Sequence, residues 1–308
     1  MHIEILGSAA GGGFPQWNCT CPNCHSVRAG TFRGKSRTQT QVAVSNDDVS
    51  WFLLNASPDL RLQIEAARPL HPRFPGRHSP ISGVLLTSAD LDQITGLLSL
   101  RELHPFRIYC TPSLRTMLKE HNSVFAMLNR TPDQVEWVEI KPGQSFPLQA
   151  ISGNLSELRC EVFSIGSRYP AYVSREQAAG LVPEEASLGV IIESASGKRL
   201  AYLPAVPALD EQLLRRVETA DVLLFDGTFW GDDELIRVQG SGATAHEMGH
   251  LPVSGGGSLQ KLASVRRPRK IFIHVNNTNP MLDESGPEYR EVRAAGWEIA
   301  EDGWRLDL

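Results

Sequence analysis

Short runs rich in apolar and β-branched residues recur along the whole sequence, and they constrain the fold more than any other feature. Their length and the turn-forming residues around them predict β-strands. Helix-like stretches at residues 59–70, 113–122, 208–220 and 286–296 fall between several of them. The strand-like runs are HIEILGS (2–8), TQVAVS (40–45), SWFLLNA (50–56), ISGVLLT (81–87), FRIYC (106–110), LRCEVFSIG (158–166), LGVIIES (188–194), RLAYLP (199–204), ADVLLFDG (220–227) and KIFIHVNN (270–277).

The order of these runs predicts an α/β protein with two packed sheets. The early half is rich in strands and hairpin-like, whereas the later half alternates strand with helix, which favours two sheets flanked by helices over one doubly wound sheet. No internal repeat or low-complexity linker divides the chain, so we expect a single domain over residues 1–308. Ser57-Pro58 and Thr111-Pro112 predict helix N-caps followed by proline at the first helical position.

Composition excludes several classes of protein. The 308 residues, 41% apolar and 21% charged, can bury a large core. The net charge of −5 provides no positive field for nucleic acid, and we interpret the basic cluster at 266–270 as a solvated loop before a strand. No apolar run of about 18 residues could span a membrane, and the N-terminus resembles a first strand rather than a leader. We therefore expect a cytoplasmic protein.

Three of the five cysteines lie within six residues, in the order C-x-C-x-x-C. Such spacing can wrap three thiolates around one ion, and a structural zinc with three sulfurs and one further ligand is the stable use of that group. A loop of free thiols is the alternative. His25 is a poor fourth ligand because adjacent residues seldom converge on one centre, so the fourth ligand should come from elsewhere in the chain. The three residues, in the loop after the first strand, are Cys19, Cys21 and Cys24.

Polar side chains stand at the ends of three later segments: Asp226 in LLFDGT, His250 in EMGHLPV and His274 in FIHVNNTNP. Singly, Asp226 could be a turn or cap residue and His274 a core histidine. Asp92 lies in the turn TSADLDQITGL, which follows another strand. Together with His250 and His274 it supplies two imidazoles and one carboxylate, the set that holds a non-haem ferrous ion and leaves positions open for oxygen and substrate.

Six segments follow one another along the chain: LGSAAGGGFPQWNC, NASPDLR, LLTSADLDQITGLLSLRE, LLFDGT, MGHLPV and IHVNNTNP. Together they resemble the PqqB family, metallo-β-lactamase-fold proteins of pyrroloquinoline quinone (PQQ) biosynthesis. The resemblance spans nearly the whole chain and implies an αββα sandwich with its site at the shared edge of two sheets. In hydrolytic members of the fold the turn reads T-H-x-H-x-D-H-x-x-G-L, and Ser88, Asp90, Asp92 and Gln93 stand at those positions here, so the two-metal hydrolase site is mostly absent.

The resemblance implies iron- and oxygen-dependent hydroxylation of the tyrosine ring in a cross-linked Glu-Tyr precursor. Asp92, His250 and His274 would then be the Fe²⁺ ligands and the catalytic residues, together with Asp226 as a further ligand or as a partner of a ligand. Binding of iron needs an ionised carboxylate and neutral imidazoles, so activity should fall in mild acid.

Three further residues are expected around the cofactors: Asp90, Gln93 and Asn277. Gln93 departs from the family, which usually shows histidine there, and an amide binds ferrous iron far more weakly than imidazole. It could instead hydrogen-bond a bound water or the phenol of the substrate. The related phosphodiesterase branch has a zinc-binding histidine at the position of Asn277, which leaves the fourth zinc ligand open.

Two other functions compete with the hydroxylase. A carrier or binding protein for PQQ is favoured by Gln93 and opposed by the surviving Asp92, His250 and His274. Hydrolysis of a phosphodiester or an amide requires two bridged ions, and the losses at positions 88, 90 and 93 disfavour it. The expected partner is the small-molecule precursor or PQQ, without nucleic acid or membrane. A homodimer is compatible with the sequence, which does not decide the oligomeric state.

Overall fold

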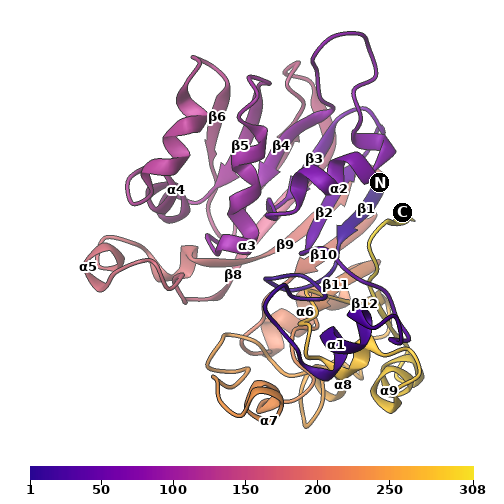
Figure 1. The fold of residues 1–308 in the computed structure, drawn as a ribbon. Coiled ribbons are helices and arrows are strands. Elements are labelled where there is room, and N and C mark those ends of the chain that lie inside the picture. Colours follow the sequence, from indigo (N-terminus) through magenta and orange to yellow (C-terminus); the bar gives the residue numbers. More distant parts are fainter. The chain divides into compact units, whose positions relative to one another are not determined.

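The computed structural model describes residues 1–308, and the chain forms two compact units (Figure 1). The first unit contains residues 1–6, 41–198 and 303–308, and the second contains residues 7–40 and 199–302. None of the helices combines the length and the apolar character that a membrane crossing requires. The single domain expected over residues 1–308 stays a prediction.

The first unit contains a mixed seven-stranded sheet with the order β14-β1-β2-β3-β4-β5-β6. β14 pairs antiparallel with β1, and β2 with β3, whereas β3 to β6 run parallel. Every residue of β2, β3, β4 and β5 is buried, as their apolar composition predicts. The bounds are β1 His2–Gly7, β2 Gln41–Ser45, β3 Trp51–Leu54, β4 Ile81–Leu85, β5 Phe106–Cys110, β6 Val135–Glu139 and β14 Trp304–Asp307.

The same unit holds three antiparallel strands and four α-helices. β8 pairs with both β7 and β9. Burial alternates over the first half of β8, which indicates that one of its faces packs on the core. The strands are β7 Ser145–Gln149, β8 Leu155–Gly166 and β9 Ser187–Ser194, and the helices are α2 Leu60–Ala66, α3 Leu91–Ile94, α4 Pro112–Lys119 and α5 Arg175–Ala178.

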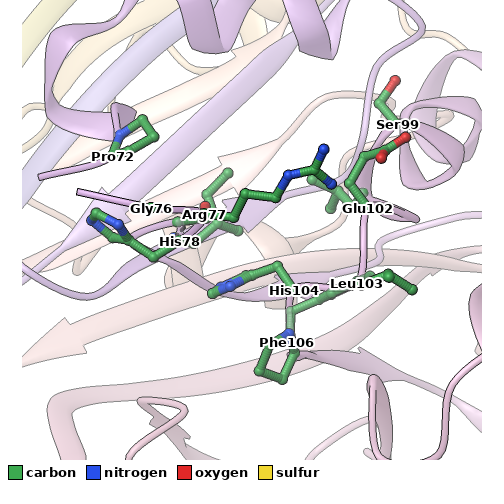
Figure 2. A pocket seen from close by; sticks show the side chains of 13 residues that line it. Pro72, Gly76, Arg77, His78, Ser99, Glu102, Leu103, His104 and Phe106 are labelled. Atoms are coloured by element: carbon green, nitrogen blue, oxygen red, sulfur yellow. Dashed lines mark hydrogen bonds between the residues drawn. The ribbon is translucent and has the colours of Figure 1, made fainter. Parts of the chain in front are cut away.

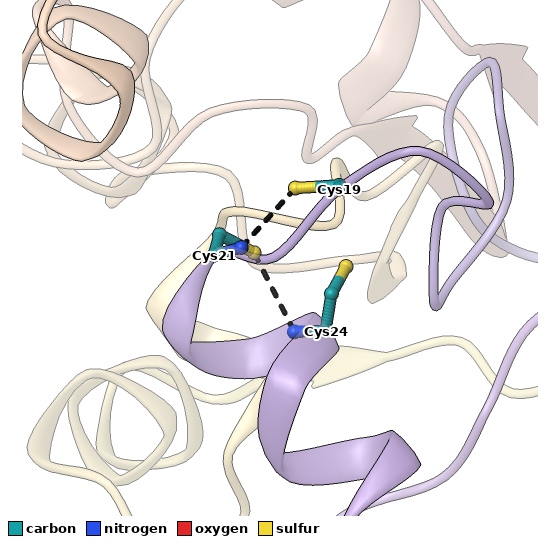
Figure 3. Close-up of side chains that lie close together, drawn as sticks. All are labelled: Cys19, Cys21 and Cys24. Carbon is teal, nitrogen blue, oxygen red and sulfur yellow. Dashed lines mark hydrogen bonds between the residues drawn. The ribbon is translucent and has the colours of Figure 1, made fainter.

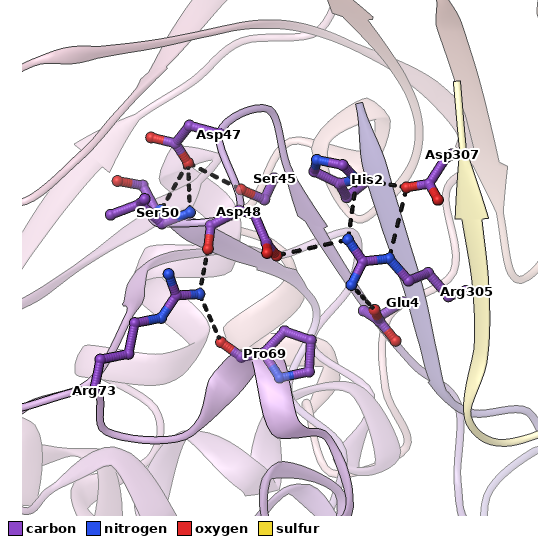
Figure 4. Close-up of polar contacts among 11 residues, drawn as sticks. His2, Glu4, Ser45, Asp47, Asp48, Ser50, Pro69, Arg73, Arg305 and Asp307 are labelled. Carbon is purple, nitrogen blue, oxygen red and sulfur yellow. Dashed lines mark hydrogen bonds and ion pairs between the residues drawn. The ribbon is translucent and has the colours of Figure 1, made fainter.

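The two ends of the chain meet in this sheet. The amino group of Met1 donates to the carbonyl of Leu308 at 2.8 Å, and Arg305 of β14 faces Glu4 of β1 at 3.4 Å (Figure 4). Glu4 is only 6% exposed. Burial raises its pKa, while the Arg305 guanidinium opposes that rise. Pairing of the terminal strands is thus reinforced by an ion pair across their interface.

One predicted helix cap is correct and the other is wrong. Thr111 caps α4, accepting a hydrogen bond from the amide of Leu114. Ser57 does not cap α2, because this helix begins two residues beyond the proline, after Asp59. The Ser57 hydroxyl instead accepts from the amide of Asp59 and donates to the side chain of Gln63, which fastens the turn that precedes the helix.

The second unit contains four parallel strands, and their parallel order positions the candidate metal ligands. In the register of β11 with β12, Asp226 lies opposite Ile273, so Asp226 and the following His274 emerge at the same edge. The strands are β10 Arg199–Leu203, β11 Val222–Asp226, β12 Arg269–Ile273 and β13 Trp297–Ile299. The helices are α1 Pro22–Arg28, α6 Glu211–Glu218, α7 Glu234–Gln239, α8 Ser258–Lys261 and α9 Pro287–Ala294.

We predict that Glu234 makes the stability of the protein depend on pH. Its buried carboxylate accepts from the Thr278 hydroxyl and the Trp230 amide, and burial raises its pKa to about 7, from 4.5 for an exposed glutamate. Between these two pKa values the folded state binds a proton that the unfolded state has released. The stabilisation that results is fully present below pH ~4.5 and is lost as pH rises through about 7. Between pH 5 and pH 8 the free energy of unfolding should therefore fall by roughly 1–3 kcal/mol more in the wild type than in Glu234→Gln.

Urea denaturation at a series of pH values measures this effect. Glu218→Gln, on the exposed side of α6, is the matched control and should follow the wild type. Parallel curves for the wild type and Glu234→Gln would contradict the prediction.

Candidate metal centres

The three thiols of residues 19–24 converge on one point, and we call them the cysteine cluster (Figure 3). Cys21 is the N-cap of α1 and its sulfur accepts from the amide of Cys24 at 3.5 Å, while the sulfur of Cys19 accepts from the amide of Cys21 at 3.4 Å. All three sulfurs lie within 4.8 Å of one another. Proline at the start of α1 sets this turn, so a local sequence signal builds the cluster.

Charge in the cysteine cluster needs compensation. Burial raises the pKa of Cys21 to about 12. At Cys19 burial acts in the same direction, but hydrogen bonds from Cys21, Cys24 and Asn277 lower its pKa overall. These hydrogen bonds make the thiolate of Cys19 less costly than that of Cys21, whereas three buried thiolates require a cation among them. This donor set and its spacing fit zinc.

Asn277 is the remaining polar group of the cysteine cluster. It is 3% exposed, and its side-chain nitrogen lies 3.2 Å from the sulfur of Cys19, 3.6 Å from that of Cys21 and 3.3 Å from that of Cys24. The residue therefore faces all three thiols from the segment that follows β12. The structure brings together the cysteines and Asn277, which lie more than 250 positions apart in the sequence.

A second group, which we call the histidine cluster, consists of Asp226, His250 and His274. Their candidate ligand atoms lie within 4.8 Å of one another, and the two imidazoles stack with centroids 5.5 Å apart. Asp226 is fully buried at the end of β11, and His274 follows β12 with a φ of 60°. A positive φ is uncommon for a histidine and turns the chain sharply as it leaves the strand.

Hydrogen bonds fix the protonation of both histidine rings. The Thr228 hydroxyl donates its one proton to Asp226 Oδ1 at 2.6 Å, so it can only accept from Nδ1 of His274, which lies at 2.8 Å. Nδ1 of His250 lies 2.8 Å from Asp226 Oδ2 and donates to that carboxylate. Both Nδ1 atoms thus carry a proton, and in the neutral form of each ring the lone pair is on Nε2, the atom that would bind a metal.

The Asp226 carboxylate stays charged in this buried position. Burial opposes its ionisation, but His250, His274 and Thr228 together hold its pKa below the ordinary value. The amides of Val206 and Thr228 donate to its two oxygens as well. An anionic carboxylate beside two imidazoles is a donor set that fits a divalent first-row metal, including ferrous iron.

The turn that contains Asp92 lies in the first unit, where it forms its own polar network. Gln93 donates from its amide nitrogen to Asp92 at 2.9 Å, and its amide oxygen accepts from Asn55 at 2.5 Å. The Ser88 hydroxyl donates to Asp90 at 3.0 Å. Gln93 therefore orients the carboxylate of Asp92. The role of Asp92 as an iron ligand stays a prediction.

Sequence reasoning missed two residues that organise these sites. Thr228 follows Asp226 by two positions in LLFDGT, and Asn55, with a φ of 66°, holds both Gln93 and Thr87. Asn55 directly follows β3, and Thr228 is two residues beyond the end of β11. A short polar residue at a strand end was the available signal.

The first unit also holds a cavity of about 520 Å³, shown in Figure 2. Its lining includes Arg77, His78, Glu102 and His104 but none of the residues expected at either metal centre. Burial lowers the pKa of His104, so this ring favours its neutral form. His78 and His104 are not among the groups whose ligand atoms converge.

The sequence of this chain is similar to those of known proteins. A family model described as "Beta-lactamase superfamily domain" matches residues 50–275. Coenzyme PQQ synthesis protein B of a Methylorubrum extorquens strain is 43% identical over 309 residues, and that of Azotobacter vinelandii is 42% identical over 309 residues. Both alignments cover 100% of each chain.

Solved structures of known proteins also have a fold similar to that of this chain. The crystal structure of Zn²⁺-bound PqqB from Methylobacterium extorquens superposes with a TM-score of 0.91 at 42% identity and covers 100% of both chains. A diphosphatase from the PhnP family has a TM-score of 0.67 at 18% identity and covers 100% of this chain and 97% of its own. The second likeness shows a shared fold alone.

We predict that the cysteine cluster binds a structural zinc that stabilises the fold. Cys21→Ser should lose the zinc and lower the free energy of unfolding, because binding of a structural zinc is coupled to folding. Cys160→Ala, in the core of the first unit, is the control and should keep the metal. Elemental analysis decides the outcome, and one full equivalent of zinc in a variant with all three cysteines replaced by serine would refute the prediction.

We also predict that Thr228 sets metal affinity at the histidine cluster. Thr228→Val keeps the shape but removes the hydroxyl that accepts from Nδ1 of His274, so ferrous affinity should fall about 10–100-fold. Anaerobic titration with ferrous ions measures it, and Thr219→Val at the end of α6 should leave the affinity unchanged. Equal affinities for Thr228→Val and the wild type would show that the hydroxyl does not orient the ring.

Proposed function

The chain belongs to the family of coenzyme PQQ synthesis protein B, in the β-lactamase superfamily, and from this membership we propose that it is an iron- and oxygen-dependent hydroxylase. The α/β fold of metallo-β-lactamase type predicted from the sequence is confirmed by these matches. The proposed substrate is a cross-linked Glu-Tyr precursor of PQQ, and the proposed reaction adds oxygen to its tyrosine ring.

The observation that carries the proposal is the histidine cluster. His250 and His274 each keep a proton on Nδ1, through Asp226 and Thr228, and each turns the Nε2 lone pair to a would-be metal. Two imidazoles with a nearby carboxylate are the donors that hold non-haem iron and leave positions open. A ferrous ion, when bound, supplies activation of oxygen, which the side chains of the protein cannot provide.

The residues of the chain would bind and orient the reactants. Asp226 keeps His250 in the tautomer that can ligate, and its own negative charge offsets part of the charge of a bound cation. Asp92 is the further carboxylate that we propose as an iron ligand. Gln93, whose amide nitrogen donates to Asp92, would hold that carboxylate in one rotamer rather than bind the metal itself.

We propose that zinc and iron bind at different clusters. The crystal structure of PqqB from Methylobacterium extorquens is that of a Zn²⁺-bound protein. In this chain we assign a structural zinc to the cysteine cluster, whose all-sulfur donors suit zinc, and we assign iron to the histidine cluster, whose donors are nitrogen and oxygen.

A carrier protein for PQQ is the second candidate, and one observation favours it. Gln93 stands where members of the family usually have histidine, and its oxygen already accepts a hydrogen bond from Asn55. A turn with fewer metal ligands could serve a protein that only binds the finished cofactor. The carrier would not need the protonation pattern of the histidine cluster, so its function should not depend on His274.

We predict that His274→Ala abolishes both ferrous binding and substrate-dependent oxygen uptake, because no neighbouring donor replaces the lost imidazole. Gln93→His should raise ferrous affinity without being required for turnover. His246→Ala is the matched control, since this exposed histidine pairs with Asp232 outside the histidine cluster. Anaerobic iron titration and an oxygen electrode, with a cross-linked Glu-Tyr peptide as substrate, measure both quantities.

If the protein is a PQQ carrier, we expect the opposite results for His274→Ala. PQQ affinity, measured by fluorescence quenching, would survive His274→Ala, and no variant would consume oxygen with the precursor. A wild-type protein that binds no iron under anaerobic conditions would contradict the hydroxylase assignment.

A further inference from the structure

The cysteine cluster supplies three ligands, and zinc in a structural site takes four. Asn277 stands at the position where the fourth would lie. With zinc bonded to sulfur at about 2.3 Å and to oxygen at about 2.0 Å in tetrahedral geometry, the fourth ligand atom is about 3.5 Å from each sulfur. The amide nitrogen of Asn277 lies 3.2, 3.6 and 3.3 Å from the three sulfurs.

From this geometry we propose that the side-chain amide oxygen of Asn277 is the fourth ligand of the zinc ion in the cysteine cluster. The inference rests on the zinc assigned to that cluster under the proposed function. An amide nitrogen has no free lone pair for a metal, but half a turn about the Cβ–Cγ bond of Asn277 exchanges nitrogen for oxygen. No hydrogen bond to the amide oxygen would be broken by that turn.

The backbone around Asn277 is held so that only its side chain needs to turn. The amide of Asn23, on α1 between two of the cysteines, donates to the carbonyl of Asn277 at 3.1 Å and to the carbonyl of Asn279 at 3.0 Å. Asn279 in turn donates to the carbonyls of Gly227 and Thr228. The segment is thus fastened at both sides of Asn277.

The charge of the site also suits a neutral fourth ligand. Three thiolates and Zn²⁺ leave one negative charge, which the amides of Cys21 and Cys24 partly offset by donating to sulfur. An aspartate at 277 would add a second negative charge in a position that is 3% exposed. The carboxamide supplies an oxygen donor without that charge.

The ligand role has a consequence for the histidine cluster. Asn277 is three residues beyond His274, and the two are joined by a segment whose Val275 carbonyl and amide bond to Ala10 and Ser8. Zinc bound to Asn277 would therefore hold the end of the segment that starts at the histidine. Loss of the bond between zinc and Asn277 should weaken zinc binding and also make the position of His274 less fixed.

Cobalt in place of zinc tests the proposal in the full-length protein. The sulfur-to-cobalt charge-transfer bands arise only from the cysteine cluster, so they report on it without interference from the histidine cluster. Added imidazole should leave these bands unchanged in the wild type, whose fourth position is filled, and shift them in Asn277→Ala, where water occupies it. Chelator should extract zinc from Asn277→Ala about 10–100-fold faster than from the wild type.

Two further variants keep the test decisive. Asn276→Ala, the neighbouring asparagine whose side chain bonds to Thr278, should behave as the wild type. Asn277→His should give the shifted bands without added imidazole, and this comparison serves even if the alanine variant does not fold. Wild-type bands that shift with imidazole as readily as those of Asn277→Ala would overturn the ligand assignment alone. A wild type with no charge-transfer bands would overturn the zinc site itself, and the ligand with it.

Discussion

A fully buried carboxylate organises the second unit. Asp226 has no access to water, so its charge must be matched by donors from the protein. The amides of Val206 and Thr228, the Thr228 hydroxyl and a ring of the histidine cluster supply them. The position and the tautomer of His250 follow directly from this requirement, and those of His274 follow through the hydroxyl. The donor set for a metal is therefore a consequence of satisfying one buried charge.

The segment from His274 to Asn279 connects the two clusters of possible metal ligands. Its first residue belongs to the histidine cluster, Asn277 faces the three thiols, and Asn279 returns to the carbonyls of Gly227 and Thr228. Because both clusters lie in the same compact unit, the order of this segment is shared between them. A zinc ion bound at the cysteine cluster, as proposed, would fix the strand end that His274 follows.

Much of this arrangement was predictable from local patterns. Apolar strands that end on Asp-Gly and on His-Val-Asn-Asn point their polar residues to one edge, and the structure brings Asp226 and His274 together there. The C-x-C-x-x-C spacing likewise predicts convergent thiols. The failures share a physical cause. The roles of Thr228 and Asn55 depend on hydroxyl and amide directions set by loops, and the start of α2 depends on the partners of Ser57, so neither spacing nor periodicity reveals them.

The proposed iron ion in the histidine cluster would transfer oxygen to a phenol. Mass spectrometry of the product formed under ¹⁸O₂ tests it most directly, with zinc-loaded protein, ferrous iron and the cross-linked Glu-Tyr peptide in ordinary water. We expect a hydroxylated tyrosine ring that contains ¹⁸O from the gas. Product with oxygen only from water, or intact precursor after incubation with fully iron-loaded protein, would contradict it.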